Sequence, residues 1–302
     1  MKKEKLFFQF YKAIDLCFSP GVDKHSYKKS KETKVKIFSY ADRRNIIKVT
    51  DQLSKFIEKN YSNINYIKDI TDKEIKAFFD DKALSCSKNT LMNYKYCIKK
   101  IEKMVQQELH LKVNYINNIK IESHNNYLLR DIELSEKHLE IILENGLKSN
   151  SKAVIAIEFA ALFGCRVSEI SKLQGRDIDL DKKLIHIIDS KGKRSRDIKI
   201  STEKQLEFCQ KIKVRIGEYE RVCPLREDSI NTYIRRALLK NNITIYSEKK
   251  TGVHAIRKYY AKRDYIKNIE KTNSPQKAWA QTSLNLGHSS NRKTLINTYV
   301  KY

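Results

Sequence analysis

The sequence predicts a mainly α-helical protein that contains one small β-sheet. Only 3 of the 302 residues are Pro and 8 are Gly, so there is little material for the many turns of a loop-rich β protein. Apolar residues recur every three or four positions along most of the chain, as they do on one face of a helix. They make up 40% of the total, which is enough to bury real cores, and the length favours about two domains.

The chain divides into four segments by composition and periodicity. The first contains a short apolar stretch, the turn signal Ser19-Pro20-Gly21 and many lysines, and we interpret it as an N-terminal extension or as part of the first domain. The third is rich in Asn and weakly periodic, which is typical of a linker. We assign residues 1–38 to the N-terminal segment, 39–112 to a first helical domain, 113–130 to the linker and 131–302 to a second domain.

Three helices are predicted in the first helical domain. The first begins near Tyr40, which falls on the same face as Ile46 and the apolar residues that follow it. The second opens with Thr71 and Glu74, which have the spacing of a capping box. The third runs over residues 87–107 and presents a lysine-rich face opposite its apolar face.

The second domain combines helices with the predicted sheet. Ser135 has the position of an N-cap, and the helix that it opens is expected to end near Gly146. An apolar helix follows and closes at Gly164. A β-hairpin is predicted from two segments rich in β-branched residues, 184–188 and 197–200. They lie on either side of a turn that contains a glycine.

The charge balance indicates a polyanionic partner. The chain holds 61 Lys+Arg against 36 Asp+Glu, a formal net charge of +25, and both halves are basic. Lys88, Lys95 and Lys99 on the third helix are therefore candidate DNA contacts, although a lysine-rich face is equally typical of a solvated surface. A generally lysine-rich proteome would produce the same balance.

The cysteines and the apolar segments indicate an intracellular protein, and we expect it in the cytoplasm. None of the 6 cysteines forms a CxxC pair or a Cys/His spacing typical of a zinc site, so we expect reduced thiols and no metal. No apolar run is long enough to span a bilayer, so no membrane partner is expected.

Four separated segments could contribute to one site. Each alone is weak, because an arginine at a helix start, a Lys-Gly turn or a His and an Arg on one helix face are common on ordinary surfaces. Their occurrence together and in this order, in a basic helical chain, favours a shared function. The segments are Gly164-Cys165-Arg166-Val167-Ser168-Glu169, Ser190-Lys191-Gly192-Lys193, His254-Ala255-Ile256-Arg257 and Leu286-Gly287-His288-Ser289, with Tyr299 following the last of them.

On these motifs, residues from about 130 to 302 resemble the catalytic domain of the tyrosine recombinase (phage integrase) family. Residues 39–110 are similar, much less specifically, to the helical (SAM-like) core-binding domain of that family. The resemblance implies a helical core-binding domain and a mixed α/β catalytic domain that together form a C-shaped clamp around DNA. It implies as catalytic residues Arg166, Lys191, His254, Arg257, His288 and Tyr299, with Glu169 supporting the first arginine.

The resemblance also implies a chemical role for each of these residues. The two guanidiniums hold the non-bridging oxygens of a phosphodiester while the tyrosine attacks phosphorus and forms a 3′-phosphotyrosine link. The hairpin lysine protonates the departing 5′-oxygen, the first histidine assists as a general acid/base and the second donates to the phosphate. No cofactor is required. Arg196, beside the hairpin turn, is expected to contact DNA.

The sequence departs from the family pattern at two points. Lys258 stands where many relatives carry a second histidine after the H-x-x-R arginine. Tyr302 is a competing nucleophile, because the gap between His288 and Tyr299 is slightly longer than in the commonest members. The residues around Tyr299 fit the family pattern better.

The interpretation that follows is a site-specific DNA recombinase that integrates, excises or resolves a mobile element. We expect it to bind double-stranded DNA, to be a monomer in free solution and to form a homotetramer on synapsed DNA. Two alternatives remain from the sequence: a non-catalytic DNA-binding protein on the same fold, and a DNA-relaxing enzyme similar to type IB topoisomerases.

Overall fold

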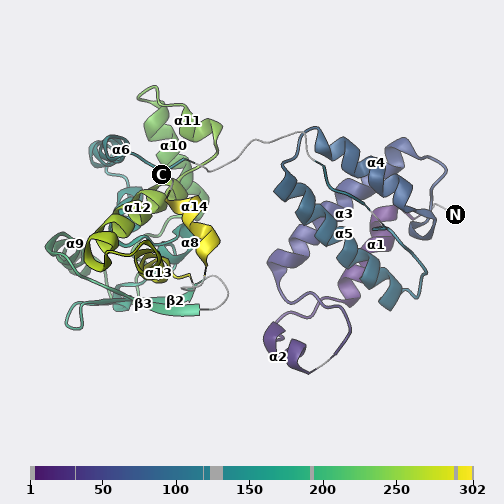
Figure 1. Cartoon of the computed structure of the whole chain (residues 1–302), viewed down its shortest axis with the longest axis horizontal. Helices are drawn as coiled ribbons and strands as arrows, with labels where there is room; N and C mark the ends of the chain where they lie inside the picture. The colour runs from purple at the N-terminus through teal and green to yellow at the C-terminus, as the bar shows by residue number, and fades with distance from the viewer. Residues whose placement is uncertain are drawn as a thin grey trace. The chain divides into compact units, whose positions relative to one another are not determined.

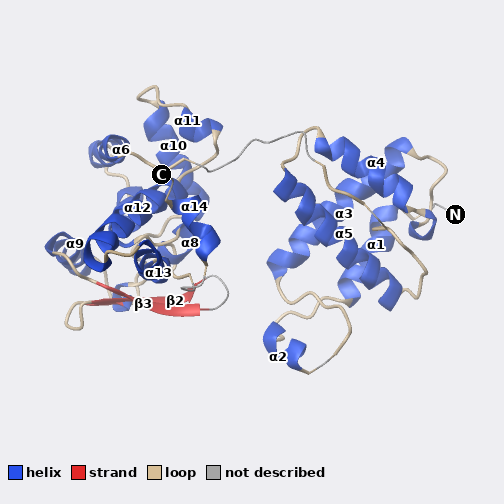
Figure 2. Cartoon of the chain, in the orientation of Figure 1, coloured by secondary structure: helices blue, strands red, loops and turns tan. Residues whose placement is uncertain are grey.

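The protein folds into two compact units in a computed structural model, Met1–Tyr127 and Leu128–Tyr302. The structure describes residues 4–30, 32–117, 119–122, 132–190, 194–288 and 292–300. These residues are mostly helical, with one small sheet in the second unit (Figure 2). The prediction of a mainly helical protein with a small β-sheet is confirmed. No helix in this part of the chain is both long and apolar enough to cross a membrane.

The first unit is built around a long pair of helices, α3 and α5, against which α1 packs (Figure 1). Its core includes Leu6, Phe10 and Ile14 of α1, so the segment before residue 38 takes part in this core. The helices of this unit are α1 (Leu6–Leu16), α2 (Lys24–Lys29), α3 (Tyr40–Asn60), the 3-10 helix η1 (Ile67–Asp69), α4 (Asp72–Ala83) and α5 (Lys88–Glu108).

Side-chain caps fix where these helices begin. The Ser39 side chain accepts a hydrogen bond from the Asp42 backbone N–H at the start of α3. Thr71 and Glu74 form the capping box expected from their spacing, and the Glu74 carboxylate accepts from the Thr71 backbone N–H at 2.9 Å. Tyr40 differs from expectation: it is 65% exposed, because the first turn of α3 extends beyond the core.

Residues 113–122, which we assigned to the linker, pack in part on the first unit. Val113, Tyr115 and Ile119 are buried in its core. The Tyr115 hydroxyl donates to the Ile67 carbonyl at 2.9 Å, and the Tyr115 backbone N–H donates to the Glu102 carboxylate. The described residues of this segment form no helix, so its buried residues do not repeat every three or four positions and the periodicity did not show them.

The second unit surrounds an apolar helix with further helices and the sheet. Its elements are α6 (Glu136–Lys148), α7 (Ala153–Phe163), α8 (Val167–Ile170), η2 (Gly175–Asp177), β1 (Ile178–Asp179), β2 (Leu184–Ser190), β3 (Arg194–Lys199), α9 (Glu203–Arg215), α10 (Glu227–Leu239), α11 (Ile245–Glu248), α12 (Val253–Thr272), α13 (Pro275–Asn285), η3 (Lys293–Leu295) and α14 (Ile296–Tyr299). The sheet has the antiparallel order β1-β2-β3. The predicted hairpin is β2–β3, and the two-residue β1 was too short to show a pattern.

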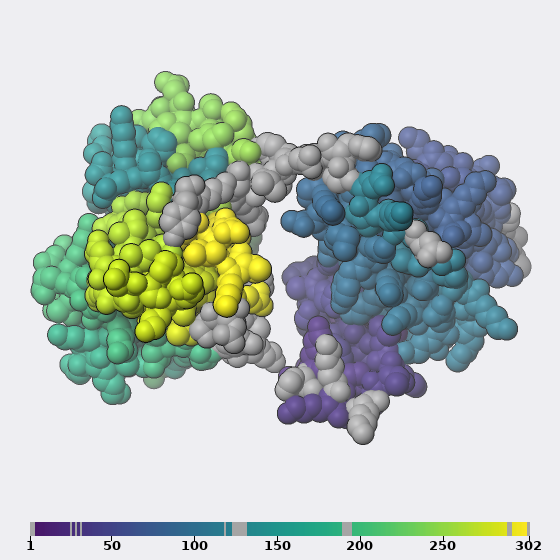
Figure 3. Space-filling view, viewed as in Figure 1, coloured from purple at the N-terminus to yellow at the C-terminus, as the bar shows by residue number. Residues whose placement is uncertain are grey.

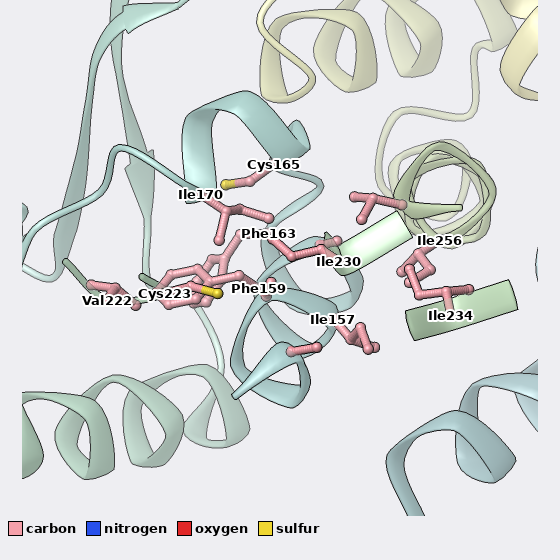
Figure 4. Packing of buried hydrophobic residues seen from close by; sticks show 14 of the residues in the cluster. Ile157, Phe159, Phe163, Cys165, Ile170, Val222, Cys223, Ile230, Ile234 and Ile256 are labelled. Atoms are coloured by element: carbon pink, nitrogen blue, oxygen red, sulfur yellow. The ribbon is translucent and has the colours of Figure 1, made fainter. Parts of the chain in front are cut away.

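Helix α7 lies at the centre of this unit. Phe159 and Phe163 are completely buried and meet Ile170 and Ile230 in a continuous apolar cluster (Figure 4). A helix that is apolar on all sides has to be covered on all sides, and α6, α8, α10 and α12 cover α7. This arrangement fixes α8 and α12, which carry three of the candidate site residues.

Gly146 and Gly164 each need to be glycine, for different structural reasons. The helix α6 was expected to end near Gly146, and it ends two residues further on, at Lys148. A Cβ at position 146 would lie 2.1 Å from a methyl carbon of Val154, so the glycine permits close packing of α7 rather than a helix end. Gly164 does end α7, with φ +64°, and a Cβ there would meet the Tyr260 ring at 2.4 Å.

A second, smaller core holds the C-terminal elements. It is formed by Ala261 and Tyr265 of α12, Ala278 and Trp279 of α13, and Leu286, Tyr299 and Val300. In the space-filling view, the yellow C-terminal segment lies against the yellow-green surface of the preceding helices (Figure 3). Tyr299 is thus positioned by the helix that also carries His254 and Arg257.

Candidate active site

The N-terminus of α8 places Arg166 beside a buried carboxylate. The left-handed turn at Gly164 directs the chain into Arg166, which is the N-cap residue of this short helix. The Glu169 carboxylate accepts from the Arg166 backbone N–H at 2.8 Å and from its Nη1 at 2.6 Å. The Glu169 side chain is only 1% exposed, so its charge requires such partners.

Arg196 contacts the same carboxylate from β3. Its Nη1 and Nη2 donate to the two oxygens of Glu169 at 2.7 and 2.9 Å, which makes a bidentate ion pair. Burial would lower the pKa of Arg196, but the hydrogen bonds and charge of Glu169 raise it overall. We expected Arg196 to contact DNA. The structure instead directs its guanidinium inward, because a buried carboxylate offers it two hydrogen bonds and an opposite charge.

Arg257 joins three segments that are far apart in the sequence. It lies in the first turns of α12 and is 2% exposed. Its Nη1 donates to the Gly164 carbonyl and its Nη2 to the Leu286 carbonyl. Burial lowers the pKa of this guanidinium, although the value stays far above neutrality in any arginine, so the site retains a positive charge.

Tyr299 lies directly against this guanidinium. Its hydroxyl oxygen is 3.3 Å from Nε2 of His288 and accepts from Nε of Arg257 at 3.5 Å. The ring of His254 meets the Tyr299 ring edge-on, with centroids 5.7 Å apart. Tyr299 is 6% exposed. The same chain therefore brings a phenol, two imidazoles and a guanidinium together.

His288 is held in a neutral state by its surroundings. Gly287 turns the chain with φ +69°, and the His288 backbone N–H then donates to the Ser283 carbonyl at 2.8 Å. Burial, followed by the positive charges of Arg257 and Arg166, lowers the pKa of His288 to about 4. A neutral imidazole can donate one N–H to an oxygen without adding another cation to the site.

Other candidate residues differ in where the structure places them. Lys191 and Tyr302 lie outside the described residues. Lys88 and Lys99 are exposed on α5 of the first unit, whereas Lys95 donates to the Ile119 carbonyl of the same unit. Contact of these three lysines with DNA stays a prediction.

Trp279 belongs to the site, and sequence reasoning missed it. It is the single tryptophan of the chain, and its ring packs 6.4 Å from that of Tyr299. Its Nε1 donates to the Arg292 carbonyl at 3.1 Å, which ties α13 to the segment that leads into α14. A lone tryptophan shortly before the tyrosine was the available signal. Lys258 of α12 is also buried.

The arrangement suits an anionic, oxygen-rich substrate. Arg257 and the neutral imidazole of His288 contact the phenol, and Arg166 and Arg196 bind the buried Glu169 carboxylate nearby. Arginine is the side chain that best matches phosphate oxygens while remaining charged. Within the described ranges, no group of three or more His, Cys, Asp or Glu residues could hold a metal ion.

The chain is similar to known recombination proteins. The model of the phage integrase family matches residues 133–301. A lambda integrase tetramer bound to a Holliday junction is 16% identical, over 97% of this chain and 76% of that one, with a TM-score of 0.64. A lambda integrase dimer bound to a COC′ core site is 17% identical, over 93% and 77%, with a TM-score of 0.62.

The Tn1549 transposon integrase in complex with a circular intermediate DNA is also similar. It is 16% identical, over 98% of this chain and 95% of that one, with a TM-score of 0.60. At such identities the likeness shows the fold alone. No curated protein matches the chain by sequence.

We expect the His288 imidazole to titrate near pH 4, well below its ordinary value of 6.5. Because its pKa is lowered in the folded chain, the stability that neutral His288 contributes is present above pH 6.5 and is lost as the pH falls toward 4. Side-chain ¹H–¹⁵N spectra across a pH titration measure the midpoint, and His288→Gln identifies the signal. Arg292→Met should raise the midpoint, since Arg292 is one of the charges that lower it, while Lys293→Met should raise it less. A midpoint at or above 6.5 would contradict this account.

Proposed function

The chain belongs to the phage integrase family, and on that premise we propose that it is a tyrosine site-specific recombinase that cuts and rejoins DNA through a covalent 3′-phosphotyrosine intermediate. The observation that carries this proposal is the position of the Tyr299 hydroxyl. It lies within 3.5 Å of Arg257 and His288, in a site that also holds Arg166. A phenol needs such neighbours to attack a phosphodiester, and a structural tyrosine does not.

The proposed attack follows from the charges of the site. As the Tyr299 oxygen bonds to phosphorus, negative charge grows on the non-bridging oxygens. Arg166 and Arg257 hold those oxygens, and the neutral His288 donates a further hydrogen bond. His254, whose ring is next to the phenol, accepts the phenolic proton.

Departure of the 5′-oxygen completes the cleavage. That oxygen leaves as the phosphotyrosyl bond forms, and it takes a proton from Lys191 in the turn between β2 and β3. The phosphotyrosyl ester keeps the free energy of the broken bond, so a 5′-hydroxyl can attack it and rejoin the strand without ATP. Attack by the 5′-hydroxyl of another duplex exchanges strands.

We further propose how the protein engages DNA in the cell. The core-binding and catalytic domains close as a clamp around the duplex, with Lys88 and Lys99 of the first unit among the phosphate contacts. The protein integrates, excises or resolves a mobile element. It acts in the cytoplasm, where its six free cysteines stay reduced. Sequencing the DNA that flanks the gene would provide the recombination site for the assays below.

We expect Tyr299→Phe to abolish the covalent adduct with a nicked suicide duplex and to leave DNA binding intact, because only the attacking oxygen is removed. Denaturing gels measure the adduct and gel shifts measure binding. Tyr302→Phe is the matched control and should form the adduct normally. Adduct formation by Tyr299→Phe together with its loss in Tyr302→Phe would contradict the assignment. Adduct without strand joining would favour a relaxing enzyme, and binding without adduct a non-catalytic protein.

We expect Arg166→Ala to slow cleavage by about 100-fold or more, the usual scale for loss of a donor to the transition state. Lys191→Ala should also slow it. A substrate with a 5′-bridging sulfur needs little protonation when it leaves, so it should restore cleavage by Lys191→Ala and not by Arg166→Ala. Lys193→Ala serves as the control for the hairpin. Rescue of that variant instead would reassign the general acid.

We expect a monomer in free solution and a tetramer on synapsed DNA, because two duplexes are each cut on both strands. Light scattering with and without DNA measures both states, and a stable DNA-free tetramer would contradict the proposal. Mixing Tyr299→Phe with Arg166→Ala should not restore cleavage, because Tyr299 lies beside Arg257 and His288 of its own chain. Restored cleavage would show that the tyrosine is delivered to a neighbouring protomer.

A further inference from the structure

We propose that Arg196 is a positioning residue of the active site, which keeps the Arg166–Glu169 pair positively charged and holds the hairpin base against the His288 turn. This inference rests on the proposed function and assigns Arg196 a role other than DNA contact. Four features support it: the sharing of one carboxylate, the charge balance of the three groups, the contact with Gly287 and the strand pairing at the base of the hairpin.

The Glu169 carboxylate accepts hydrogen bonds from two arginines. Its Oε1 accepts from Nη1 of Arg166 at 2.6 Å and from Nη1 of Arg196 at 2.7 Å. Its Oε2 accepts from the Arg166 backbone N–H at 2.8 Å and from Nη2 of Arg196 at 2.9 Å. Arg196 thus binds both oxygens in the geometry that only a guanidinium provides, and it fixes the orientation of the group that orients Arg166.

The charge balance shows what the second arginine adds. Arg166 and Glu169 alone form a neutral pair, which has little attraction for a phosphate. With Arg196 the three groups carry one net positive charge. The side chains of Arg166 and Arg196 are 17% and 15% exposed, so solvent screens this charge only in part. The phosphate that Arg166 is proposed to hold therefore meets a cation rather than a neutral ion pair.

Arg196 also contacts the turn that presents His288. An added Cβ at Gly287 would lie 2.6 Å from Nη1 of Arg196 and 2.7 Å from its Cζ, so the guanidinium packs closely on the glycine. Its Nε is buried and has no hydrogen-bond partner in the part of the chain that the structure describes. The Arg196 side chain thus leaves Nε without a hydrogen bond while it contacts both Glu169 and Gly287, which indicates that these two contacts determine its position.

The strand pairing extends this contact to the hairpin. Arg196 on β3 is the register partner of Ile187 on β2, at the point where the pairing becomes irregular before Ser190. In the sequence, Lys191 directly follows the last residue of β2. One side chain therefore connects the base of the hairpin, the helix start that carries Arg166 and the turn that carries His288.

Single-turnover cleavage and DNA binding of four variants test the proposal. Arg196→Met removes the charge and both hydrogen bonds, and Arg196→Lys keeps the charge without the bidentate geometry. Glu169→Gln combined with Arg196→Met returns the group to one net positive charge. Lys199→Met is the matched control, since Lys199 is exposed on the same strand and its loss costs the same charge.

We expect Arg196→Met to slow cleavage by about 10- to 100-fold, the scale of a displaced catalytic group, with DNA affinity within about twofold of the native protein. Arg196→Lys should be intermediate, Lys199→Met should cleave normally, and Glu169→Gln should restore part of the rate lost in Arg196→Met. A loss of DNA affinity with a salt dependence reduced by about one phosphate contact would overturn the proposal and make Arg196 a DNA contact. The proposal would also be overturned if Arg196→Met cleaved as fast as Lys199→Met, or if adding Glu169→Gln did not raise the cleavage rate of Arg196→Met.

A measurement without DNA separates this proposal from the proposed function. In Arg196→Met the His288 titration midpoint should move upward, because one nearby positive charge is lost, and in Lys199→Met it should move less. This shift would appear even if the native protein formed no adduct, which would refute the recombinase chemistry alone. An unchanged His288 midpoint in a folded Arg196→Met protein would overturn the contact between Arg196 and the His288 turn. Thermal unfolding confirms folding, and Arg196→Gln, which removes the same charge, replaces Arg196→Met if the latter does not fold.

Discussion

The second unit depends on how it accommodates the buried charge of Arg257. A guanidinium removed from water has to be compensated by acceptors, and the carbonyls of Gly164 and Leu286 provide them. Each carbonyl is at a left-handed turn, at Gly164 itself and at Gly287 after Leu286, with φ of +64° and +69°. The chain leaves the first turn toward the N-cap of α8 and the second toward the histidine of the Leu-Gly-His segment. One charge therefore organises both functional segments from the centre of the site.

The site as a whole carries more positive charge than it compensates. Arg166 and Arg196 share the Glu169 carboxylate, Arg257 binds backbone carbonyls, and burial together with these positive charges lowers the pKa of His288. Like charges held together in a partly buried site repel one another, so this arrangement costs free energy in the free protein. In the proposed reaction, a phosphodiester relieves that repulsion, and it does so most when its own charge is greatest. Excess charge of this kind stabilises a transition state more than a ground state.

Sequence reasoning succeeded where structure is decided locally. The capping box at Thr71 and the β2–β3 hairpin follow from residues that are neighbours in the chain. It failed where a distant partner decides: Arg196 turns inward because of Glu169, which lies 27 residues earlier. Trp279 gave no local pattern, since its role depends on a ring packed against it from another element. The spacing of the motifs indicated which residues lie close together. It did not indicate which side chains are buried or bind two partners at once.

Tyr299, the proposed nucleophile, is held by two sets of contacts, one to its ring and one to its hydroxyl oxygen. Helix α14 has four residues, too few to be stable alone, so its position comes from the packing of Tyr299 and Val300 in the small core and from the Trp279 bond to the Arg292 carbonyl. These contacts hold the ring. The hydroxyl oxygen is instead held by Arg257 and His288, groups that a phosphate would also use. In the proposed reaction, a phosphate that binds Arg257 and His288 replaces these partners of the oxygen while the ring keeps its packing, so the hydroxyl is freed to attack phosphorus without moving the ring.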